Sequence, residues 1–498
     1  MCRCCWRASG KGSFPPCVIV YLDNIPSNLD IPAGVTLHAW MDVVELGRSN
    51  PDIPVKMPTN NDELALIMYT SGTTGDPKGV MHSHGSISAG VLIMEKWLLE
   101  QYKLQGNDDC YVSYLPMAHI LEFGVVNIVL GHGVLVGFGG PRTLTDITAR
   151  PHGDLTEYKP SLMVGVPRIF DTVRRGVESK LPPPGSLKRK IFDQAFESRL
   201  AALREGKDTP FYNEKVFSKP REALGGNIRL FLSGGGPLSA ATQNFMNVVF
   251  GLMVVGWGLT ETVCIGTISR WGDLEAGVTG QVLVAEELKL VDTEDYKHTN
   301  KPLPEGELCL RGPFLFKGYY KQDALTKEAI DKDGWFHTGD VGSIDAQGRV
   351  RLVGRIKALA KNVLGEYVAL EMLESIYSTH LLVLNNCACV LVNPEKSYIT
   401  LLVLTDESRA MKFAAENNLS GKFPAILKDE KFIQAAVKSL GELATKAGRK
   451  HFELVKNVCF TCDEWTPENG MLTAAMKLKR SVINQKYAKE IEQLFVAE

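Results

Sequence analysis

The chain has 498 residues, of which 45% are hydrophobic and 22% are charged, so it can bury an ordinary core and has the length of about three domains. Its 55 basic and 57 acidic residues give a net charge of −2, which excludes a bulk attraction to nucleic acid or to an anionic membrane. The 11 cysteines are scattered and most lie in apolar runs, a usage typical of a reducing compartment.

The N-terminal segment, residues 1–16, is atypical. It includes Cys2, Cys4 and Cys5, which are candidates for palmitoylation, but it lacks the apolar core of a signal peptide and the length of a membrane span. We expect this segment to be a disordered tail or the product of a wrongly assigned start.

Short apolar runs that are bounded by Gly or Pro predict buried strands at 17–22, 64–70, 162–166, 228–234 and 252–258. Helical spacing of apolar residues predicts helices at 188–205 and 239–250. Continuous apolar strands that alternate with helices are typical of an α/β fold with parallel-rich sheets covered on both faces.

The most apolar stretch is 124–140. It is broken by glycines, contains His132 and falls short of the ~20 residues that a membrane span needs. We interpret it as a buried strand and turn.

The pattern changes after about residue 341, where shorter strands precede predicted helices at 408–418, 428–447 and 480–495. This change predicts a domain boundary near Val353–Leu359 and a compact α+β domain beyond it. The predicted organisation is a tail (1–16), a large domain incomplete at its N-terminus (17–353), a hinge (354–358) and a C-terminal domain (359–498).

The most informative motif is the loop Tyr69–Val80, YTSGTTGDPKGV, which follows a predicted strand. Its glycines permit a tight turn and a close approach of the backbone to a ligand. Its hydroxyls and the Lys78 cation suit a polyphosphate, although it is neither a Walker A loop nor a dinucleotide-binding fingerprint. The residues concerned are Thr70, Ser71, Gly72, Thr73, Thr74, Gly75, Lys78 and Gly79.

This loop resembles the phosphate-loop signature of the adenylate-forming, or AMP-binding, superfamily of acyl-CoA synthetases, luciferases and peptide-synthetase adenylation domains. Further motifs follow in that family's order: SGGGPLS (233–239), GWGLTET (256–262), GWFHTGD (334–340) and GEYV (365–368). Two more, YLPMAHILE (114–122) and WTPENGMLTAAMKLKR (465–480), resemble the long-chain fatty acyl-CoA synthetases. The resemblance runs from about residue 17 to the end.

The resemblance implies a ligase that activates a long-chain fatty acid with ATP as an acyl-adenylate and then forms acyl-CoA, AMP and pyrophosphate. It implies ATP, Mg²⁺ and the co-substrate coenzyme A, and a C-terminal domain that rotates between the two steps. A cytoplasmic protein is expected, either free or peripherally bound to the cytosolic face of the endoplasmic reticulum or another membrane. The sequence has no basic stripe with interleaved aromatic residues, so nucleic acid is not an expected partner.

The resemblance also assigns the nucleotide site. Thr73 and Glu261 are expected to hold Mg²⁺, whose shell suits a hydroxyl and a carboxylate completed by phosphates and water. Trp257 takes the place of the aromatic residue against the adenine, and Asp340, joined by Arg355, is expected to accept the ribose hydroxyls. The other matched nucleotide-binding positions are Gly234, Gly235, Gly236, Pro237, Gly258 and Thr260.

Four further residues match positions that act in one of the two half-reactions or in the hinge. His119 is expected to place the fatty-acid carboxylate, and Lys479 to reach the α-phosphate. Lys357 matches the pivot of the hinge, and Lys361 a lysine that serves during thioester formation. Lys477, two residues before Lys479, could be confused with it. The alternative interpretation of His119 is a structural histidine of the core, and that of the KLKR segment is a basic helix start.

The sequence departs from the family pattern in three places. Two hinge aspartates are replaced by Gly354 and Ala358, and the stretch after Val282 is short. The chain also begins late, which predicts an N-terminal truncation. A non-catalytic relative, or an enzyme that stops at the acyl-adenylate, therefore remains an alternative. The CxxC formed by Cys459 and Cys462 is weak evidence for a metal or redox site.

Overall fold

The computed structural model describes residues 17–22, 34–70, 77–146, 149–473 and 476–496. The chain forms two compact units, residues 1–59 and 60–498. In the first unit, β1 (Cys17–Tyr21) pairs in parallel with β2 (Val35–Ala39), and α2 (Trp40–Arg48) follows. Residues 1–16 lie outside the described residues, and the predicted hinge at 354–358 stays a prediction.

The second unit is built on a seven-stranded sheet of order β11-β10-β9-β8-β7-β5-β6. Five neighbouring strands are parallel: β5 (Cys110–Ser113), β6 (Leu135–Phe138), β7 (Leu162–Gly165), β8 (Leu230–Ser233) and β9 (Leu252–Gly258). The antiparallel strands β10 (Gly266–Ile268) and β11 (Gln281–Val282) complete the sheet. The predicted parallel-rich α/β fold is confirmed.

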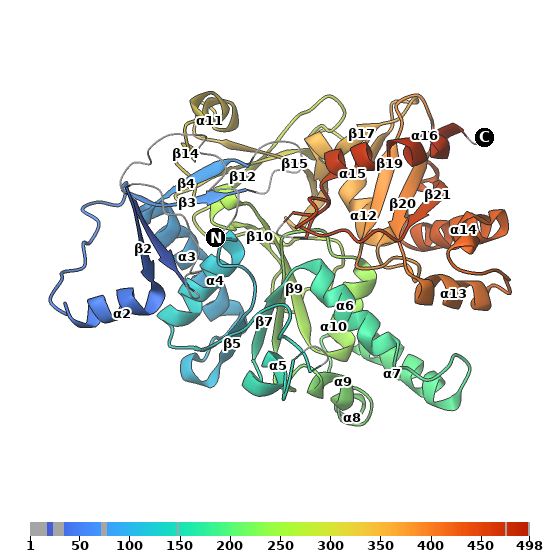
Figure 1. The fold of residues 1–498 in the computed structure, drawn as a ribbon, viewed down its shortest axis with the longest axis horizontal. Helices are drawn as coiled ribbons and strands as arrows, with labels where there is room; N and C mark the ends of the chain where they lie inside the picture. The colour runs from blue at the N-terminus through green and yellow to red at the C-terminus, as the bar shows by residue number, and fades with distance from the viewer. Residues whose placement is uncertain (1–16, 23–33, 71–76, 147–148, 474–475, 497–498) are drawn as a thin grey trace. The chain divides into compact units, whose positions relative to one another are not determined.

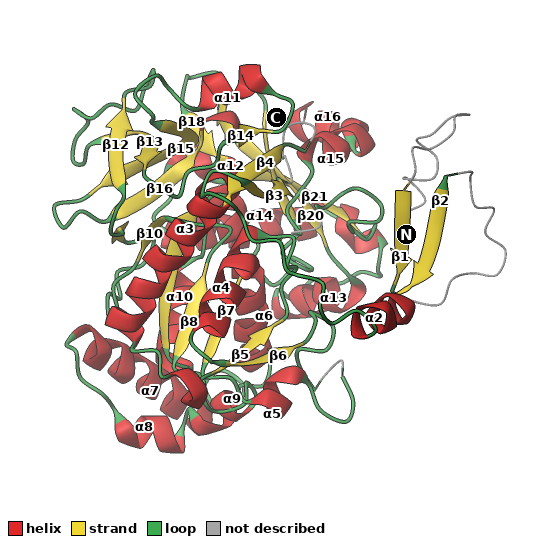
Figure 2. Cartoon of the chain, turned by 90° about the vertical axis from the view of Figure 1, so that its left-hand side faces the viewer, coloured by secondary structure: helices red, strands yellow, loops and turns green. Residues whose placement is uncertain are grey.

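Helices cover both faces of this sheet (Figure 2). One core joins the sheet to α3 (His84–Trp97) and α4 (Ile120–Gly131). A second core joins it to α6 (Pro167–Glu178), α7 (Leu187–Arg204) and α10 (Ala240–Val249), which confirms the predicted helices at 188–205 and 239–250. Shorter helices are α5 (Asp154–Tyr158), α8 (Pro210–Lys215) and α9 (Ser218–Glu222).

The interpretation of 124–140 as strand and turn is wrong in its first half. Residues up to Gly131 continue α4, and only β6 is a strand. Because α4 is packed between α3 and the sheet, apolar residues surround it on nearly every side, and such a helix shows no amphipathic period.

Two antiparallel sheets flank this layer. The first contains β12 (Glu287–Val291), β13 (Glu305–Arg311), β15 (Phe336–Ile344) and β16 (Val350–Arg355). The second contains β14 (Gly318–Tyr319), β4 (Gly79–Ser83) and β3 (Leu64–Tyr69), so the predicted strand at 64–70 is confirmed. Helix α11 (Asp323–Ala329) follows β14.

The C-terminal part is α+β (Figure 1). Strands β17 (Leu359–Lys361) and β18 (Tyr367–Ala369) form a ribbon, and β19 (Ala388–Val392), β20 (Ile399–Leu404) and β21 (Val455–Thr461) form a sheet. The helices are α12 (Leu370–Tyr377), α13 (Glu407–Glu416), α14 (Glu430–Lys446), α15 (Arg480–Lys486) and α16 (Ala488–Val496). Within the described ranges, no helix has both the length and the apolar character needed to cross a membrane.

Candidate active site

The candidate site lies at the carboxyl ends of the parallel strands, where open α/β sheets bind their ligands. The Gly234 N–H donates to the carbonyl of Gly165 at 3.2 Å, which ties the loop after β8 to the loop after β7. At the end of β9, a Cβ on Gly258 would lie 2.2 Å from the carbonyl oxygen of Cys264, so the close approach requires glycine. Gly235, Gly236 and Pro237 continue the loop after β8, with Gly235 at φ +78°.

Asp340, Trp257 and Arg355 form the centre of the site. The Trp257 indole N–H donates to Asp340 Oδ2 at 2.7 Å, and Arg355 Nε lies 3.2 Å from Oδ1. Burial raises the pKa of Asp340 and is opposed by the Arg355 cation and the indole bond, while Asp340 raises the pKa of Arg355. Each carboxylate oxygen has a second lone pair, so the predicted acceptance of ribose hydroxyls remains available to Asp340.

Glu261 lies in a short helical turn, Thr260–Thr262, beside this group. Its Oε1 accepts a hydrogen bond from the Tyr319 hydroxyl at 2.9 Å, and buried His82 bonds through Nε2 to the Thr260 carbonyl at 2.7 Å. Burial raises the pKa of Glu261, while Tyr319, Arg355 and Lys78 lower it. Carboxylate oxygens are ligands that Mg²⁺ prefers, so Glu261 fits the predicted role in holding the ion.

The base of the phosphate loop is next to Glu261. The Thr70 N–H donates to the Lys78 carbonyl at 2.9 Å, which closes the hairpin between β3 and β4. The Lys78 Nζ lies 4.6 Å from the centre of the Tyr319 ring. The hydroxyl of the same tyrosine bonds Glu261. The loop residues Ser71, Gly72, Thr73, Thr74 and Gly75 lie outside the described residues, so the role of Thr73 stays a prediction.

His119 caps the N-terminus of α4. Its Nδ1 accepts the Leu121 N–H at 3.3 Å, which places the ring proton on Nε2. Burial, and then the positive charge of Lys477, lower the pKa of His119. His119 is therefore a neutral imidazole at neutral pH.

Lys477, rather than Lys479, carries its charge into the site. Burial and Arg355 lower the pKa of Lys477, and the negative charges of Glu371 and Asp340 oppose this. Its own charge lowers the pKa of both His119 and Asp340. Lys477 therefore lies near the predicted carboxylate-placing residue and the predicted ribose-binding residue.

A tight hairpin presents Lys477. Leu472 and Leu478 form a β-bridge, and the Thr473 N–H donates to the Lys477 carbonyl at 2.8 Å. Lys479 instead caps α15, where its carbonyl accepts hydrogen bonds from Val482 and Ile483. The sequence prediction chose Lys479, because KLKR offers two lysines and only the register of the hairpin separates them.

Lys361 lies apart from this cluster. On β17, its Nζ is 3.6 Å from Glu294 Oε1, 3.8 Å from Asp295 Oδ2 and 4.8 Å from the centre of the Tyr367 ring. These contacts tie Lys361 to the loop between β12 and β13. The side chain of Lys357, the predicted pivot, lies outside the described residues.

Sequence reasoning missed several residues that shape the site. Glu371 on α12 raises the pKa of Arg355 and Lys477 by its charge. One turn later, Glu374 pairs with Arg480, whose Nη1 also donates to the Val390 carbonyl at 2.9 Å. Two glutamates in the apolar run VALEMLESIY were the available signal. The pair anchors α15 directly after the Lys477 hairpin.

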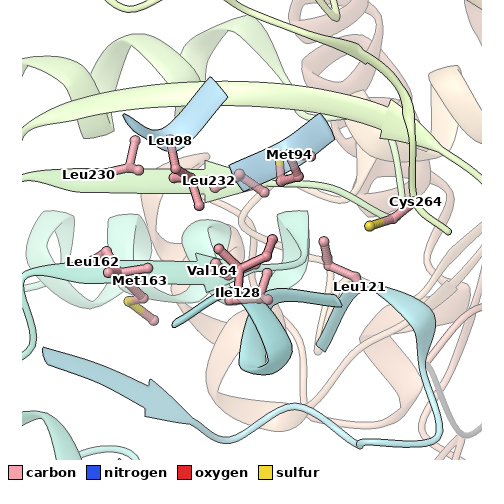
Figure 3. Close-up of a pocket in the computed structure, with 11 residues that line it drawn as sticks. Met94, Leu98, Leu121, Ile128, Leu162, Met163, Val164, Leu230, Leu232 and Cys264 are labelled. Atoms are coloured by element: carbon pink, nitrogen blue, oxygen red, sulfur yellow. The ribbon is translucent and has the colours of Figure 1, made fainter. Parts of the chain in front are cut away.

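An apolar cavity of about 20 Å³ lies between the sheet and helices α3 and α4. Figure 3 shows Leu162 and Leu230 at one end and Leu121 and Cys264 at the other. At the latter end, the Leu121 backbone N–H bonds the His119 imidazole, and the Cys264 backbone packs against Gly258. The lining residues are Met94, Leu98, Leu121, Val125, Ile128, Leu162, Met163, Val164, Leu230, Leu232 and Cys264.

Glycine loops at the carboxyl edge of a parallel sheet, a β3–β4 hairpin that carries the ends of the TSGTTGDPKG motif and the buried Asp340–Arg355 pair fit an adenylate-forming enzyme. The model of the family described as AMP-binding enzyme matches residues 15–320. The chain is 35% identical to long chain acyl-CoA synthetase 8 of Arabidopsis thaliana over 95% of its own length and 67% of the relative. It is 37% identical to long-chain-fatty-acid–CoA ligase 1 of Schizosaccharomyces pombe over 88% and 65%.

The chain belongs to the AMP-binding enzyme family and, within it, to the long-chain acyl-CoA synthetases. It spans about two thirds of the length of the curated relatives it matches.

Solved structures share the fold. The adenylation domain of carboxylic acid reductase from Segniliparus rugosus, in complex with AMP, superposes with a TM-score of 0.72 at 24% identity, over 93% of this chain and 66% of that one. ATP-bound MatB from Rhodopseudomonas palustris gives a TM-score of 0.63 at 23% identity, over 92% and 76%.

Proposed function

We propose that this chain activates a long-chain fatty acid with ATP as an acyl-adenylate and transfers the acyl group to coenzyme A, releasing AMP and pyrophosphate. The observation that carries the proposal is that Leu121, which lines the apolar cavity, also bonds His119 through its backbone N–H, while the charge of Lys477 acts on both His119 and Asp340. A hydrocarbon chain in the cavity would bring its carboxylate to the side of the nucleotide site where a cation lies.

In the first half-reaction the protein aligns two anions and neutralises charge. Asp340 accepts the ribose hydroxyls, and Trp257, held by its bond to Asp340, packs against the adenine. Glu261, together with Thr73 of the phosphate loop, would hold Mg²⁺, which would supply neutralisation of phosphate charge. His119 donates from Nε2 to the fatty-acid carboxylate.

The lysine for the α-phosphate is Lys477 in this proposal, in place of Lys479. A long, compact cation suits an oxygen that gains negative charge as the carboxylate attacks phosphorus. Support comes from the effect of Lys477 on the pKa of His119 and Asp340.

In the second half-reaction the thiol of coenzyme A attacks the acyl-adenylate. We assign the large domain to 17–353, the hinge to 354–358 and the mobile domain to 359–498. The charge of Lys477 in the site, and the pairing of Lys361 with the loop between β12 and β13, are consistent with the adenylation orientation. Rotation about the hinge would withdraw Lys477 and bring Lys361 into use.

We also propose that the chain works in the cytoplasm at the cytosolic face of a membrane, where its poorly soluble substrate gathers. Co-sedimentation with fatty-acid-loaded vesicles tests this, and a chain that stays in the supernatant would count against it.

The function is tested with the purified chain, ATP, Mg²⁺, coenzyme A and a panel of fatty acids, with mass spectrometry of acyl-AMP and acyl-CoA. Lys477→Ala should slow acyl-AMP formation about 10²–10³-fold, the loss typical of a missing electrostatic group. Lys479→Ala is the matched control and should keep most of the activity.

The products separate the alternatives. Acyl-CoA from the parent chain supports the ligase. Acyl-AMP without acyl-CoA would limit the function to adenylation. The altered hinge residues Gly354 and Ala358 would then be the candidates for the block in the second half-reaction. If a folded chain binds ATP but forms neither acyl-AMP nor acyl-CoA, the protein is a non-catalytic relative of the family.

A further inference from the structure

One cluster of metal-ligating side chains lies outside the site described above. It is formed by Glu307 and Cys309 on β13 and by His337 on β15. Cys309 faces His337 across the ladder, and Glu307, two residues earlier, shares the same sheet face. Within the described ranges, it is the one group of three His, Cys, Asp or Glu side chains whose ligand atoms lie this close together, all within 4.8 Å.

The distances suit a tetrahedral cation. Cys309 Sγ lies 3.4 Å from His337 Nδ1, and Nδ1 lies 2.8 Å from Glu307 Oε2. Bonds of about 2.3 Å from zinc to sulfur and about 2.0 Å from zinc to nitrogen put those two ligand atoms about 3.5 Å apart at a tetrahedral angle. Small side-chain movements would open the nitrogen–oxygen distance, and water would complete the shell.

A carboxylate lies near the other ring nitrogen of His337. Asp331 Oδ2 lies 3.7 Å from His337 Nε2. Asp331 is itself fixed, since its Oδ1 accepts the Asp333 and Trp335 N–H groups at 2.9 Å. A carboxylate behind the imidazole is the usual partner of a ligating histidine, because it fixes the tautomer and raises the basicity of the other nitrogen.

Hydrogen bonding alone accounts for only part of the arrangement. Glu307 bonds both His337 and, through Oε1 at 3.0 Å, the Gly339 N–H. Cys309 is fully buried and presents its sulfur to the same Nδ1 that already bonds Glu307. A neutral thiol is a weak donor and acceptor, so its place in the group gains little from hydrogen bonding. A soft divalent cation would use all three groups at once.

We propose that Cys309 Sγ, His337 Nδ1 and Glu307 Oε2 bind one Zn²⁺-class cation and that Asp331 orients His337 for this purpose. Binding releases the Cys309 proton to solvent, because the thiolate is the ligand. The cation would lie three residues from Asp340, on the strand that carries the ribose-binding carboxylate. The proposal does not depend on the acyl-CoA synthetase activity.

The test is a titration of the purified chain, treated with a chelator, with Co²⁺ alone and with absorption read in the near-ultraviolet and visible regions. We expect one Co²⁺ per chain, with a sulfur-to-cobalt charge-transfer band and tetrahedral visible bands that Zn²⁺ displaces. Cys309→Ser should abolish the charge-transfer band, and His337→Gln should weaken binding. Asp331→Asn should weaken it about 10-fold, as expected for an orienting carboxylate.

Cys462→Ser is the matched control, because Cys459 and Cys462 form the CxxC pair and Cys462 is exposed. It should leave the spectrum unchanged. Circular dichroism of each variant verifies folding, and His337→Gln, at a half-exposed position, keeps the test informative if Cys309→Ser fails to fold. Absence of Co²⁺ binding, or binding that is lost with Cys462 and retained without His337, would overturn the proposal.

Discussion

At the scale of single residues, the charges of Lys477, Asp340 and Arg355 shift the pKa values of their neighbours, His119 included. His119 reports this coupling, because burial and the Lys477 cation both lower its pKa below the usual 6.5.

Lys477→Gln should raise the pKa of His119, because it removes a positive charge that disfavours the imidazolium. NMR titration of the imidazole signal measures the shift. Lys479→Gln, with the same change of charge two residues away, should leave that pKa in place. An unchanged pKa in Lys477→Gln, or an equal shift in both variants, would refute the assignment of Lys477.

Trp257→Phe should weaken AMP binding about tenfold. The ring is kept, but Asp340 loses an indole bond of 2.7 Å, and a hydrogen bond to a charged group contributes about 1.5–3 kcal/mol. Calorimetric titration with AMP measures the loss. Trp465→Phe is the control, because this buried indole donates to the Tyr487 hydroxyl in the C-terminal core. Equal affinities in the two variants would contradict the role of Trp257.

The residue types of the site were readable from the sequence, but their contacts were not. Asp340 and Arg355 were predicted as partners and lie 3.2 Å apart. The motif KLKR could not distinguish Lys477 from Lys479, because that choice depends on the bridge between Leu472 and Leu478. Glu371 belongs to no motif and reaches Arg355 only through the packing of α12.

At the scale of elements, strands were easier to predict than the buried helix. Buried parallel strands are short, β-rich and bounded by Gly or Pro, so β7, β8 and β9 were found close to their ends. Helix α4 was missed because its partners on both sides remove the polar face that marks most helices.

The short connection between β11 and β12 carries an acid that favours its neutral form. Glu286 Oε2 accepts the Leu283 N–H at 2.9 Å, but Oε1 is buried without a hydrogen-bond partner among the described residues. Burial raises the pKa of Glu286 to about 8.

The parent chain should lose folding stability as pH rises, because Glu286 ionises, and Glu286→Gln should not show this loss. The folded pKa lies above the unfolded value of 4.5, so the stabilisation is complete below pH 4.5 and disappears as pH rises through about 8. Urea unfolding across this range compares the variant with the parent chain. Glu287→Gln, at the exposed neighbour, is the control, and parallel pH profiles for the parent chain and Glu286→Gln would refute the expectation.

At the scale of the whole second unit, a hydrogen-bonded cluster of Arg175, Asp171 and Asn386 connects the C-terminal α+β part to helix α6. Arg175 donates to the Val383 carbonyl at 3.2 Å and to the Asn386 side chain. Asn386 Nδ2 in turn donates to Asp171 Oδ2 at 2.8 Å. These bonds join α6 to the loop before β19 in the orientation that brings Lys477 to the site.

Asn386→Ala should shift the balance between the half-reactions toward thioester formation, because it releases this orientation without touching the site. The ratio of acyl-AMP to acyl-CoA in single turnovers, measured by rapid quench, should fall. Asn385→Ala is the control, because Asn385 also has a positive φ, 52° against 58° for Asn386. An equal ratio in both variants would show that the fastening does not limit the rotation.

The near-closed state of the apolar cavity has a consequence for chain-length discrimination. A volume of about 20 Å³ accommodates roughly one water molecule, so a fatty acid that binds here, as proposed above, must separate α3 and α4 from the sheet as it enters. The free energy of that separation is largely independent of how long the acid is, whereas each buried methylene contributes about 0.8 kcal/mol. The affinity for fatty acids should therefore show a threshold in chain length. Short acids do not offset the free energy of separating the helices from the sheet, and beyond the threshold each added methylene increases the affinity.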